Sequence, residues 1–310
     1  MKKPVQVCMP CLVMLLPAVL ACQSHPTDQG TTPTTYLQGA SGDYLGQTPP
    51  GTAPSRFAPG TVPLDMYHSV TVSPDGQEIY WADMARGIMV TRRVGDRWTT
   101  PAVVSFSGGR IGANAQDDAP VVSPDNRRLY FNSLRPYGSA TTPTWHFWYS
   151  DRTASGWSSP QPMPEVINST GGMHWQASVA NSGTFYFGVF SQGASGAHLS
   201  IYFSRLVNGA YSTPEPLAAI NAFGDVVCPF IAPDESYIIF NRVVDPGPAP
   251  DGYHVSFKGG DGQWLAPQRL TQLPTGQESS FVTRDGRYVF SKNYWASARI
   301  IEDLRPRQGR

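Results

Sequence analysis

One pattern of hydrophobic and polar positions recurs five times along the chain. Each copy has an apolar run, a turn of the Pro-Asp-Gly type and a second apolar run that ends near an aromatic residue. The copies occupy residues 70–81, 120–131, 177–188, 229–240 and 279–290. The equivalent residues Pro74, Pro124, Asn181, Pro233 and Arg284 are separated by 50, 57, 52 and 51 positions. A period of about 50 residues built from short strands predicts a β-propeller with one blade per copy.

The turn inside each copy explains why its two apolar runs form a hairpin. Proline presets φ for the first central position of a turn, Asp and Asn bond back to their own backbone, and Gly accepts positive φ. Ser73-Pro74-Asp75-Gly76 combines these features. The third copy keeps Asn181-Ser182-Gly183 and the fifth keeps Arg284-Asp285-Gly286, and both suit a turn. Each copy is therefore predicted to form two antiparallel strands.

Two more segments follow each hairpin and bring the blade to four strands. A third strand is predicted at 87–93, 146–152, 198–204 and 252–258. After it comes an aromatic residue, two spacers and a proline, at Trp98–Pro101, Trp157–Pro160, Tyr211–Pro214 and Trp264–Pro267. This second segment is predicted to be the outermost strand, because an edge strand tolerates proline. We expect its aromatic residue to pack between neighbouring blades. The predicted fold is all-β, a five-bladed propeller with four-stranded antiparallel blades.

The fifth copy lacks a candidate for its outermost strand after residue 290. Its third strand is predicted at 298–304, where the sequence reads ARIIEDL, and few residues remain beyond it. Residues 52–63, just before the first copy, carry Pro54 and an apolar continuation. We predict that this N-terminal segment completes the last blade. A ring closed in this way has no exposed strand edges to invite aggregation.

The first residues of the chain indicate export. Lys2 and Lys3 precede an apolar run at 11–21, which is the layout of a signal peptide. The run ends in Val19-Leu20-Ala21-Cys22, which resembles the lipobox of bacterial lipoproteins. The resemblance implies cleavage before Cys22 and lipidation of its thiol; plain secretion is the alternative. Gln23 follows the cysteine where an inner-membrane retention signal would have Asp, which implies the outer membrane.

Three segments are predicted from this organisation. Residues 1–21 form a lipoprotein signal peptide, 22–50 carry the lipidated Cys22 and a flexible tether, and 51–310 form the propeller. The tether prediction rests on a segment rich in Thr, Gly, Gln, Ser and Pro, which has too few apolar residues for a core. Membrane attachment is expected through the lipid on Cys22 only, and the protein is expected to be a monomer.

Composition narrows the function classes. The chain has 23 basic and 23 acidic residues and no basic stripe, so nucleic acid is not an expected partner. Cys8 and Cys11 belong to the predicted signal peptide, which leaves Cys228 alone inside an apolar strand. We interpret Cys228 as a buried, inert thiol, because a nucleophile would need a nearby base and the sequence places none. No motif points to a cofactor or a metal ion.

The repeated S-P-D-[GN]-x-x-[IL]-Y-[FW] pattern resembles the TolB-type repeat of WD-like bacterial β-propellers, over residues 50–310. The resemblance implies the fold and an exported protein, and it implies little about function. TolB has an additional N-terminal α/β domain and a six-bladed ring, and the sequence shows neither. The same propeller caps peptidases of the prolyl-oligopeptidase type, but the G-x-S-x-G elbow of their hydrolase domain is not found.

A candidate site follows from the expected path of the innermost strands. In propellers these strands line the central channel, and their first residues lie at one mouth. Aligning the five copies there gathers ionisable and aromatic residues from different blades. The predicted ligand-binding residues are Tyr67, His68, Asp117, Asp118, His174, Trp175, Gln176 and Glu278.

Three interpretations of this cluster remain open. In the first, the polar side chains only satisfy one another's hydrogen bonds. In the second, Tyr67, His174 and Trp175 stack on a sugar ring or a peptide side chain while carboxylates orient it. In the third, the site is chemically active. In the last case Asp118 and Glu278 act as acid and base on a glycosidic bond. Alternatively His68, His174, Asp118 and Glu278 hold a divalent cation. The predicted function is an envelope-anchored binding propeller that presents one face to a protein, peptide or glycan. The alternative is a carbohydrate-active hydrolase or lyase.

Overall fold

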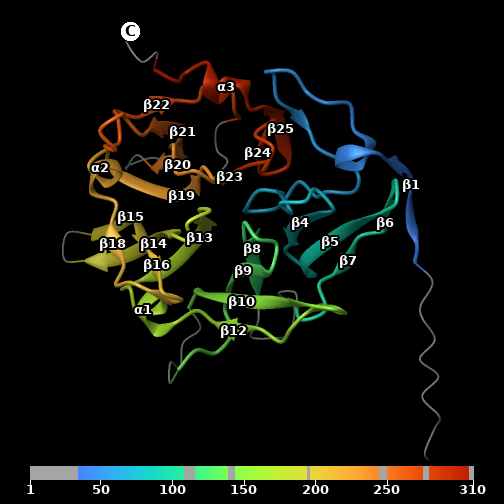
Figure 1. Ribbon diagram of the computed structural model, residues 1–310, viewed down its shortest axis with the longest axis horizontal. Helices are drawn as coiled ribbons and strands as arrows, with labels where there is room; N and C mark the ends of the chain where they lie inside the picture. The colour runs from blue at the N-terminus through green and yellow to red at the C-terminus, as the bar shows by residue number, and fades with distance from the viewer. Residues whose placement is uncertain are drawn as a thin grey trace, which may run out of the picture. The chain divides into compact units, whose positions relative to one another are not determined.

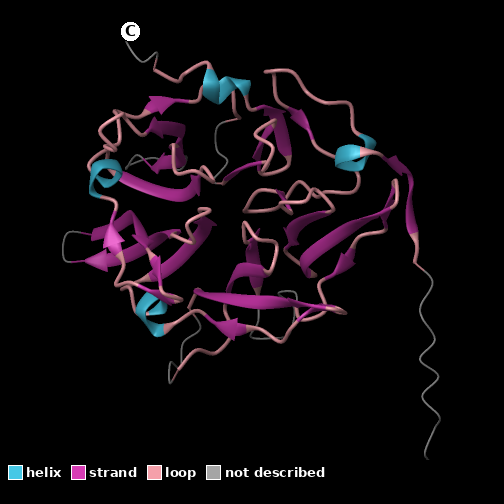
Figure 2. Cartoon of the chain, viewed as in Figure 1, coloured by secondary structure: helices cyan, strands magenta, loops and turns pink. Residues whose placement is uncertain are grey.

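Five antiparallel sheets surround a common centre, as the five repeats predict (Figure 1). The computed structural model describes residues 34–107, 116–138, 144–193, 196–243, 250–274 and 279–306. Residues 35–310 form one compact unit. Strands make up nearly all of its regular structure, and the short helices lie at the periphery (Figure 2). The all-β, five-bladed prediction is confirmed.

The blades follow one another along the chain, and every named strand pair is antiparallel. In blades 1 to 4 the chain runs from the innermost strand outward. Blade 1 contains β3 (Thr71–Val72), β4 (Glu78–Asp83), β5 (Gly87–Val94) and β7 (Ala102–Val103). Blade 2 contains β8 (Asp117–Val122), β9 (Arg128–Ser133), β10 (His146–Thr153) and β12 (Gln161–Pro162). Blade 3 contains β13 (Met173–Val179), β14 (Phe185–Gly193), β15 (Gly196–Ser204) and β18 (Glu215–Pro216). Blade 4 contains β19 (Asp225–Ile231), β20 (Tyr237–Val243), β21 (Pro250–Phe257) and β22 (Gln268–Arg269).

Blade 5 joins strands from the two ends of the unit. From the innermost strand outward it contains β23 (Ser280–Val282), β24 (Tyr288–Ser291), β25 (Tyr294–Ser297) and β2 (Ser55–Arg56). Further strands and short turns of helix lie outside the four-stranded cores of the blades: β1 (Tyr36–Ser41), β6 (Arg97–Thr99), β11 (Gly156–Trp157), β16 (Leu206–Val207), β17 (Ala210–Tyr211), η1 (Asp43–Gly46), α1 (Glu165–Asn168), α2 (Ala218–Asn221) and α3 (Arg299–Glu302).

The second strand of each blade has an apolar central stretch because it is buried on both faces. On β4, Tyr80 packs into a cluster with Leu129 and Phe131 of blade 2. Its neighbour Trp81 points the other way, into a cluster with Trp295 of blade 5. Successive side chains of a strand alternate between its faces, so each face of β4 supplies one wall of an interblade core. Equivalent clusters occupy the other three blade interfaces.

The outermost strand is divided at the predicted proline, and its aromatic residue reaches the preceding blade. In blade 2, β11 forms a short hairpin with the end of β10, and β12 pairs with β10 further along. Trp157 of β11 donates from Nε1 to Tyr80 Oη of blade 1 at 3.2 Å. Tyr211 of blade 3 lies 3.3 Å from Tyr130 of blade 2, hydroxyl to hydroxyl. The prediction that these aromatics pack between blades is confirmed.

The ring is closed by the N-terminal segment, as predicted. Ser55 and Arg56 of β2 pair with Trp295 and Tyr294 of β25, and the Phe57 N–H donates to the Asn293 carbonyl at 2.8 Å. The predicted position of the third strand of blade 5 was wrong. The third strand is β25 rather than 298–304, and α3 occupies the latter segment. A two-residue turn at 292–293 returns the chain at once, so β25 starts four residues earlier than the apolar run suggested.

The ordered unit also begins earlier than predicted. Residues 22–50 were expected to be a tether, but β1 pairs with β6 of blade 1, and Leu45 is buried beside Trp98 and Trp295. The composition concealed this segment because β1 is an edge strand with mainly exposed side chains, held by backbone pairing. The signal peptide at 1–21 and Cys22 lie outside the described residues. No helix in the described part of the chain has the length and apolar character to cross a membrane.

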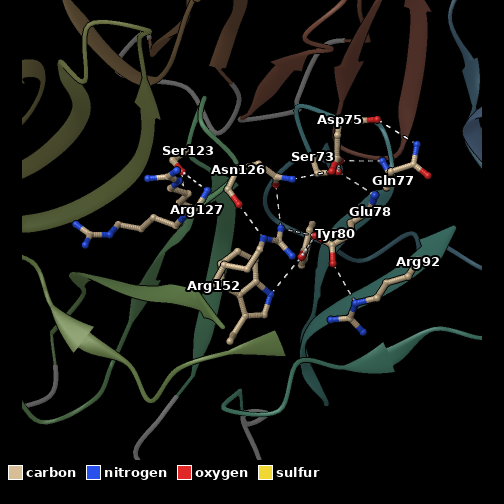
Figure 3. Close-up of polar contacts among 12 residues, drawn as sticks. Ser73, Asp75, Gln77, Glu78, Tyr80, Arg92, Ser123, Asn126, Arg127 and Arg152 are labelled. Atoms are coloured by element: carbon tan, nitrogen blue, oxygen red, sulfur yellow. Dashed lines mark hydrogen bonds and ion pairs between the residues drawn. The ribbon is translucent and has the colours of Figure 1, made fainter. Parts of the chain in front are cut away.

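A charged network joins the turn ends of blades 1 and 2 (Figure 3). Arg152 of β10 donates to Glu78 Oε2 at 2.6 Å and to Asn126 Oδ1 at 2.9 Å. Arg92 and Tyr80 also donate to the Glu78 carboxylate, at 3.0 and 2.7 Å. Burial alone would raise the pKa of Glu78, but the hydrogen bonds from Arg152 and Tyr80 and the two arginine charges outweigh it, so the pKa lies below its ordinary value.

Replacing Glu78 with Gln is expected to lower the free energy of unfolding by about 1.5–3 kcal/mol at pH 7, because charged hydrogen bonds are lost. A carboxyl whose folded-state pKa is depressed contributes stability above its unfolded pKa of about 4.3, and that contribution disappears as the pH falls through the folded-state pKa. The difference in unfolding free energy between wild type and Glu78→Gln should therefore shrink below pH 4.

Glu215→Gln, which removes an exposed partner of Arg205, is the control and should change stability by less than about 1 kcal/mol. Denaturant titrations between pH 3 and pH 7 measure both; equal losses in the two variants would contradict the prediction.

Candidate functional site

Irregular backbone marks the innermost strands at one level of the channel. The pairing register shifts after Asp118 in β8, after Trp175 in β13 and after Val227 in β19. Ala119 and Cys228 adopt φ of 50° and 55° at these points, in the left-handed region. A bulge re-aims the side chains beside it, and bulges are common next to functional sites. Cys228 is fully buried and forms no disulfide, in agreement with its predicted structural role.

A pocket of about 280 Å³ lies beside these bulges, over the inner strands of blades 1 to 3. Its walls are Tyr67, His68, Gln116, Asp118, Asn132, Trp145, His174 and Trp175. Five of them, Tyr67, His68, Asp118, His174 and Trp175, belong to the predicted set. The structure therefore brings most of the predicted residues together around one cavity.

Three wall residues were missed by the sequence analysis. Asn132 of β9 lies directly opposite Asp118 of β8 in the strand register. Counting across the hairpin from Asp118 would have found it. Gln116 precedes β8, and Trp145 precedes β10 at the end of a long interstrand loop, where no repeat position could be aligned. These positions carry no signal in the repeat itself.

Three predicted residues do not line this pocket. Asp117 is adjacent to Asp118 on β8 and turns the other way, where it forms an ion pair with Arg135 and accepts a hydrogen bond from Ser107 Oγ at 2.8 Å. Gln176 lies deeper in the channel, on a separate cavity of about 50 Å³, and donates to the Ser280 carbonyl at 3.3 Å. Glu278 lies outside the described residues.

Asp118 is held in place by contacts to one of its two oxygens. Oδ1 lies 3.1 Å from Nδ1 of His68, and it also accepts the N–H of Ala119 at 2.7 Å. Both side chains are almost fully buried in the protein, at 7% exposed for Asp118 and 9% for His68. Both of these contacts involve Oδ1.

His174 is a neutral part of the pocket wall. Its Nδ1 lies 3.2 Å from the Trp145 carbonyl oxygen, and its ring packs against those of Phe147 and His146 at 5.3 and 5.4 Å. Burial, reinforced by the nearby His146, lowers the pKa of His174 to about 4. Because the unfolded imidazole takes up a proton near pH 6.5, His174 contributes stability above that pH and loses it as the pH falls toward 4. The ring therefore carries no charge at neutral pH.

Three of the four residues predicted for a divalent cation site lie around the described pocket. Among the described residues, no three His, Cys, Asp or Glu side chains are placed to hold a metal ion. The predicted cation ligands were His68, His174, Asp118 and Glu278. The first three line the pocket and Glu278 lies outside the described residues, and His174 is committed to backbone carbonyls and aromatic packing. Asp118 is the one carboxylate among the described walls, and no lysine or arginine is found there.

Comparison with solved structures identifies other propeller-containing proteins at low sequence identity. A protein described as TolB from Agrobacterium tumefaciens aligns at 16% identity over 72% of this chain and 68% of its own, with a TM-score of 0.46. TolB from Acinetobacter baumannii aligns at 17% identity over 71% of this chain and 47% of its own, with a TM-score of 0.44. A GH74 enzyme from Niastella koreensis aligns at 16% identity over 74% and 37% of the two chains, with a TM-score of 0.40. No protein-family model and no curated protein matches the sequence.

Proposed function

We propose that this chain is a binding propeller of the bacterial cell envelope, and that its ligand enters the pocket walled by Tyr67, Asp118, Asn132, Trp145 and Trp175. The observation that carries the proposal is the convergence of aromatic and polar side chains from three blades on one cavity. A largely preformed cavity with a few convergent polar groups is the usual form of a ligand site. The partner is an envelope protein, a peptide or a glycan.

The proposed location rests on the first residues of the chain. The apolar run at 11–21 and the lipobox-like Val19-Leu20-Ala21-Cys22 support export and lipidation of Cys22, and Gln23 supports the outer membrane. A lipid on Cys22 would hold the propeller near a membrane.

Binding is better supported than the alternative of a carbohydrate-active hydrolase or lyase. Acid and base catalysis on a glycosidic bond uses two carboxyl groups on opposite sides of the bond. Asp118 supplies one among the described wall residues, and its predicted partner Glu278 lies outside them. Asp118 is instead placed to orient a ligand, because its Oδ1 is held by His68 and Ala119.

The double variant Asp118→Asn with Trp145→Ala is expected to lose its ligand while keeping its fold. The full chain, immobilised through a C-terminal tag, is exposed to detergent-solubilised envelope and to cell-wall fractions. Central contacts are worth about 2 kcal/mol or more each, about 4 kcal/mol for the two together, so the affinity should fall roughly a thousandfold. Val207→Ser, at a residue that is 54% exposed on β16, is the control and should retain the ligand. Equal retention by the wild type, the double variant and Val207→Ser, with unchanged thermal midpoints, would show that the pocket does not bind the ligand.

A further inference from the structure

We infer that the group bound in this pocket is a hydroxylated saturated ring, the pyranose unit of a glycan. This inference rests on the proposed function and names the chemistry of its ligand. It follows from three properties of the pocket: the kinds of hydrogen bond its buried atoms still require, its charge, and its aromatic walls.

The buried atoms of the pocket require a ligand that both donates and accepts hydrogen bonds. Asn132 is 3% exposed, and its Nδ2 donates to the His174 carbonyl at 3.1 Å, which leaves Oδ1 without a partner among the described residues. Oδ1 of Asn132 is an acceptor. Asp118 lies opposite Asn132 on the neighbouring strand β8, and its Oδ2 is an acceptor too. Trp175 Nε1 is also buried and has no hydrogen-bond partner among the described residues, and an indole N–H can only donate.

A hydroxyl group satisfies both requirements, whereas simple ions satisfy one. An ammonium group donates three hydrogen bonds and accepts none, so it would leave Trp175 Nε1 unpaired. A carboxylate accepts and does not donate. A carboxylate or a phosphate would also meet the negative charge of Asp118, with no lysine or arginine among the described walls to offset it. A buried polar atom left unpaired costs about 1–3 kcal/mol, which is enough to reject such ligands. Neighbouring hydroxyls would donate to Asp118 and Asn132, and a hydroxyl oxygen would accept from Trp175.

The aromatic walls favour a saturated ring as the carrier of these hydroxyls. Tyr67, Trp145 and Trp175 make up three of the eight described wall residues. Their ring faces carry partial negative charge, which attracts the C–H groups on the face of a pyranose. The volume of about 280 Å³ lies just below the usual range for ligand sites, which suits one ring rather than a buried oligosaccharide. The remainder of a glycan would extend outside the cavity.

Saturation-transfer NMR on the full chain in detergent tests this inference with defined probes. The probes are the methyl pyranosides of glucose, galactose, mannose and N-acetylglucosamine, with choline chloride, sodium phosphate and N-acetylglycinamide as the cationic, anionic and amide alternatives. At least one pyranoside is expected to bind with Kd near the millimolar range, about −4 kcal/mol, with the strongest transfer to protons of one ring face. Asn132→Leu, which removes the unpaired acceptor, should weaken that binding about tenfold, and Val207→Ser should not.

The outcomes separate this inference from the proposed function. Pyranoside binding that depends on Asn132 supports the inference. Binding of choline, phosphate or the amide in preference to every pyranoside overturns it, as does pyranoside binding unaffected by Asn132→Leu. If no pyranoside binds but envelope capture still depends on Asp118 and Trp145, the ligand class is wrong and the proposed function stands. If capture too is independent of the pocket, both are wrong.

Discussion

Replacing Phe57 with alanine is expected to lower the free energy of unfolding by about 3–5 kcal/mol. Phe57 follows β2, the strand that closes the ring, and its side chain is fully buried. Its ring centroid lies 5.1 Å from those of Phe290 and Trp295, in edge-on contacts with blade 5. Truncation removes this packing from the junction at which the two ends of the ring meet. It should also increase aggregation, because loosening β2 exposes the edge of β25.

Denaturant unfolding and light scattering measure the two effects of Phe57→Ala. Leu64→Ala is the matched control, because Leu64 lies on the same N-terminal segment, is 65% exposed, and should change stability by less than about 0.5 kcal/mol. A Phe57→Ala protein as stable as the control would mean that the closing segment does not hold the ring. Deletion of residues 45–63 should have a larger effect and leave no cooperatively folded domain.

Replacing Arg135 with methionine is expected to destabilise the protein by a similar amount, about 3–5 kcal/mol at pH 7. The Asp117 side chain is completely buried, and Arg135 is its ion-pair partner, with Nη2 3.0 Å from Oδ2. The same guanidinium donates to the Phe106 carbonyl at 2.8 Å. Methionine preserves much of the apolar stem and removes the charge, so a buried carboxylate loses its counter-ion.

The pH dependence of Arg135→Met identifies the cause. Burial raises the pKa of Asp117 even with Arg135 and the serine hydroxyls opposing it. An acid with a raised folded-state pKa contributes stability below its unfolded pKa and loses it as the pH rises through the folded-state value. Without Arg135 that pKa rises further, so the destabilisation at pH 7 should diminish as the pH falls toward 5.

A second variant separates charge from packing at this ion pair. The double variant Asp117→Asn with Arg135→Met, measured by the same denaturant titrations, should recover most of the lost stability and show no such pH dependence. A loss that is constant from pH 5 to pH 7, or that the double variant does not recover, would show that the charge of Asp117 is not responsible.

The repeated turns made the blades predictable because their chemistry is local. Proline, Asp and Gly act within four residues, so hairpins could be located wherever these residues separate two apolar runs. The closing strand was also predictable, since a ring that lacks one outer strand must obtain it elsewhere. β1 was not predictable, because an edge strand held by backbone hydrogen bonds has no apolar pattern to read. The third strand of blade 5 was misplaced because Ile300 and Ile301 are buried from a helix rather than from a strand.

The candidate site was predictable in position and less so in its members. The alignment of repeats placed Tyr67, His68, Asp118, His174 and Trp175 at one mouth, and they line one pocket. It could not decide between Asp117 and Asp118, since the direction of each side chain depends on where the bulge falls. The positive φ of Ala119 fixes that direction, and alanine at this position gives no sign of it. Trp145 was beyond reach, because its place depends on a loop with no counterpart in the other repeats.

Closure by β2 makes the stability of the whole ring depend on the presence of its last blade. Ser55 and Arg56 are among the first residues of the ring to be synthesised, and their partners Tyr294 and Trp295 are among the last. Contacts so distant in sequence form slowly and cannot begin until residues 294 and 295 have been synthesised. A chain truncated by a premature stop before residue 294 would keep four blades and two unpaired edges, and unpaired edges invite aggregation and degradation. Only a chain that contains both β2 and β25 can close the ring, so closure distinguishes chains with all five blades from fragments that lack the last one.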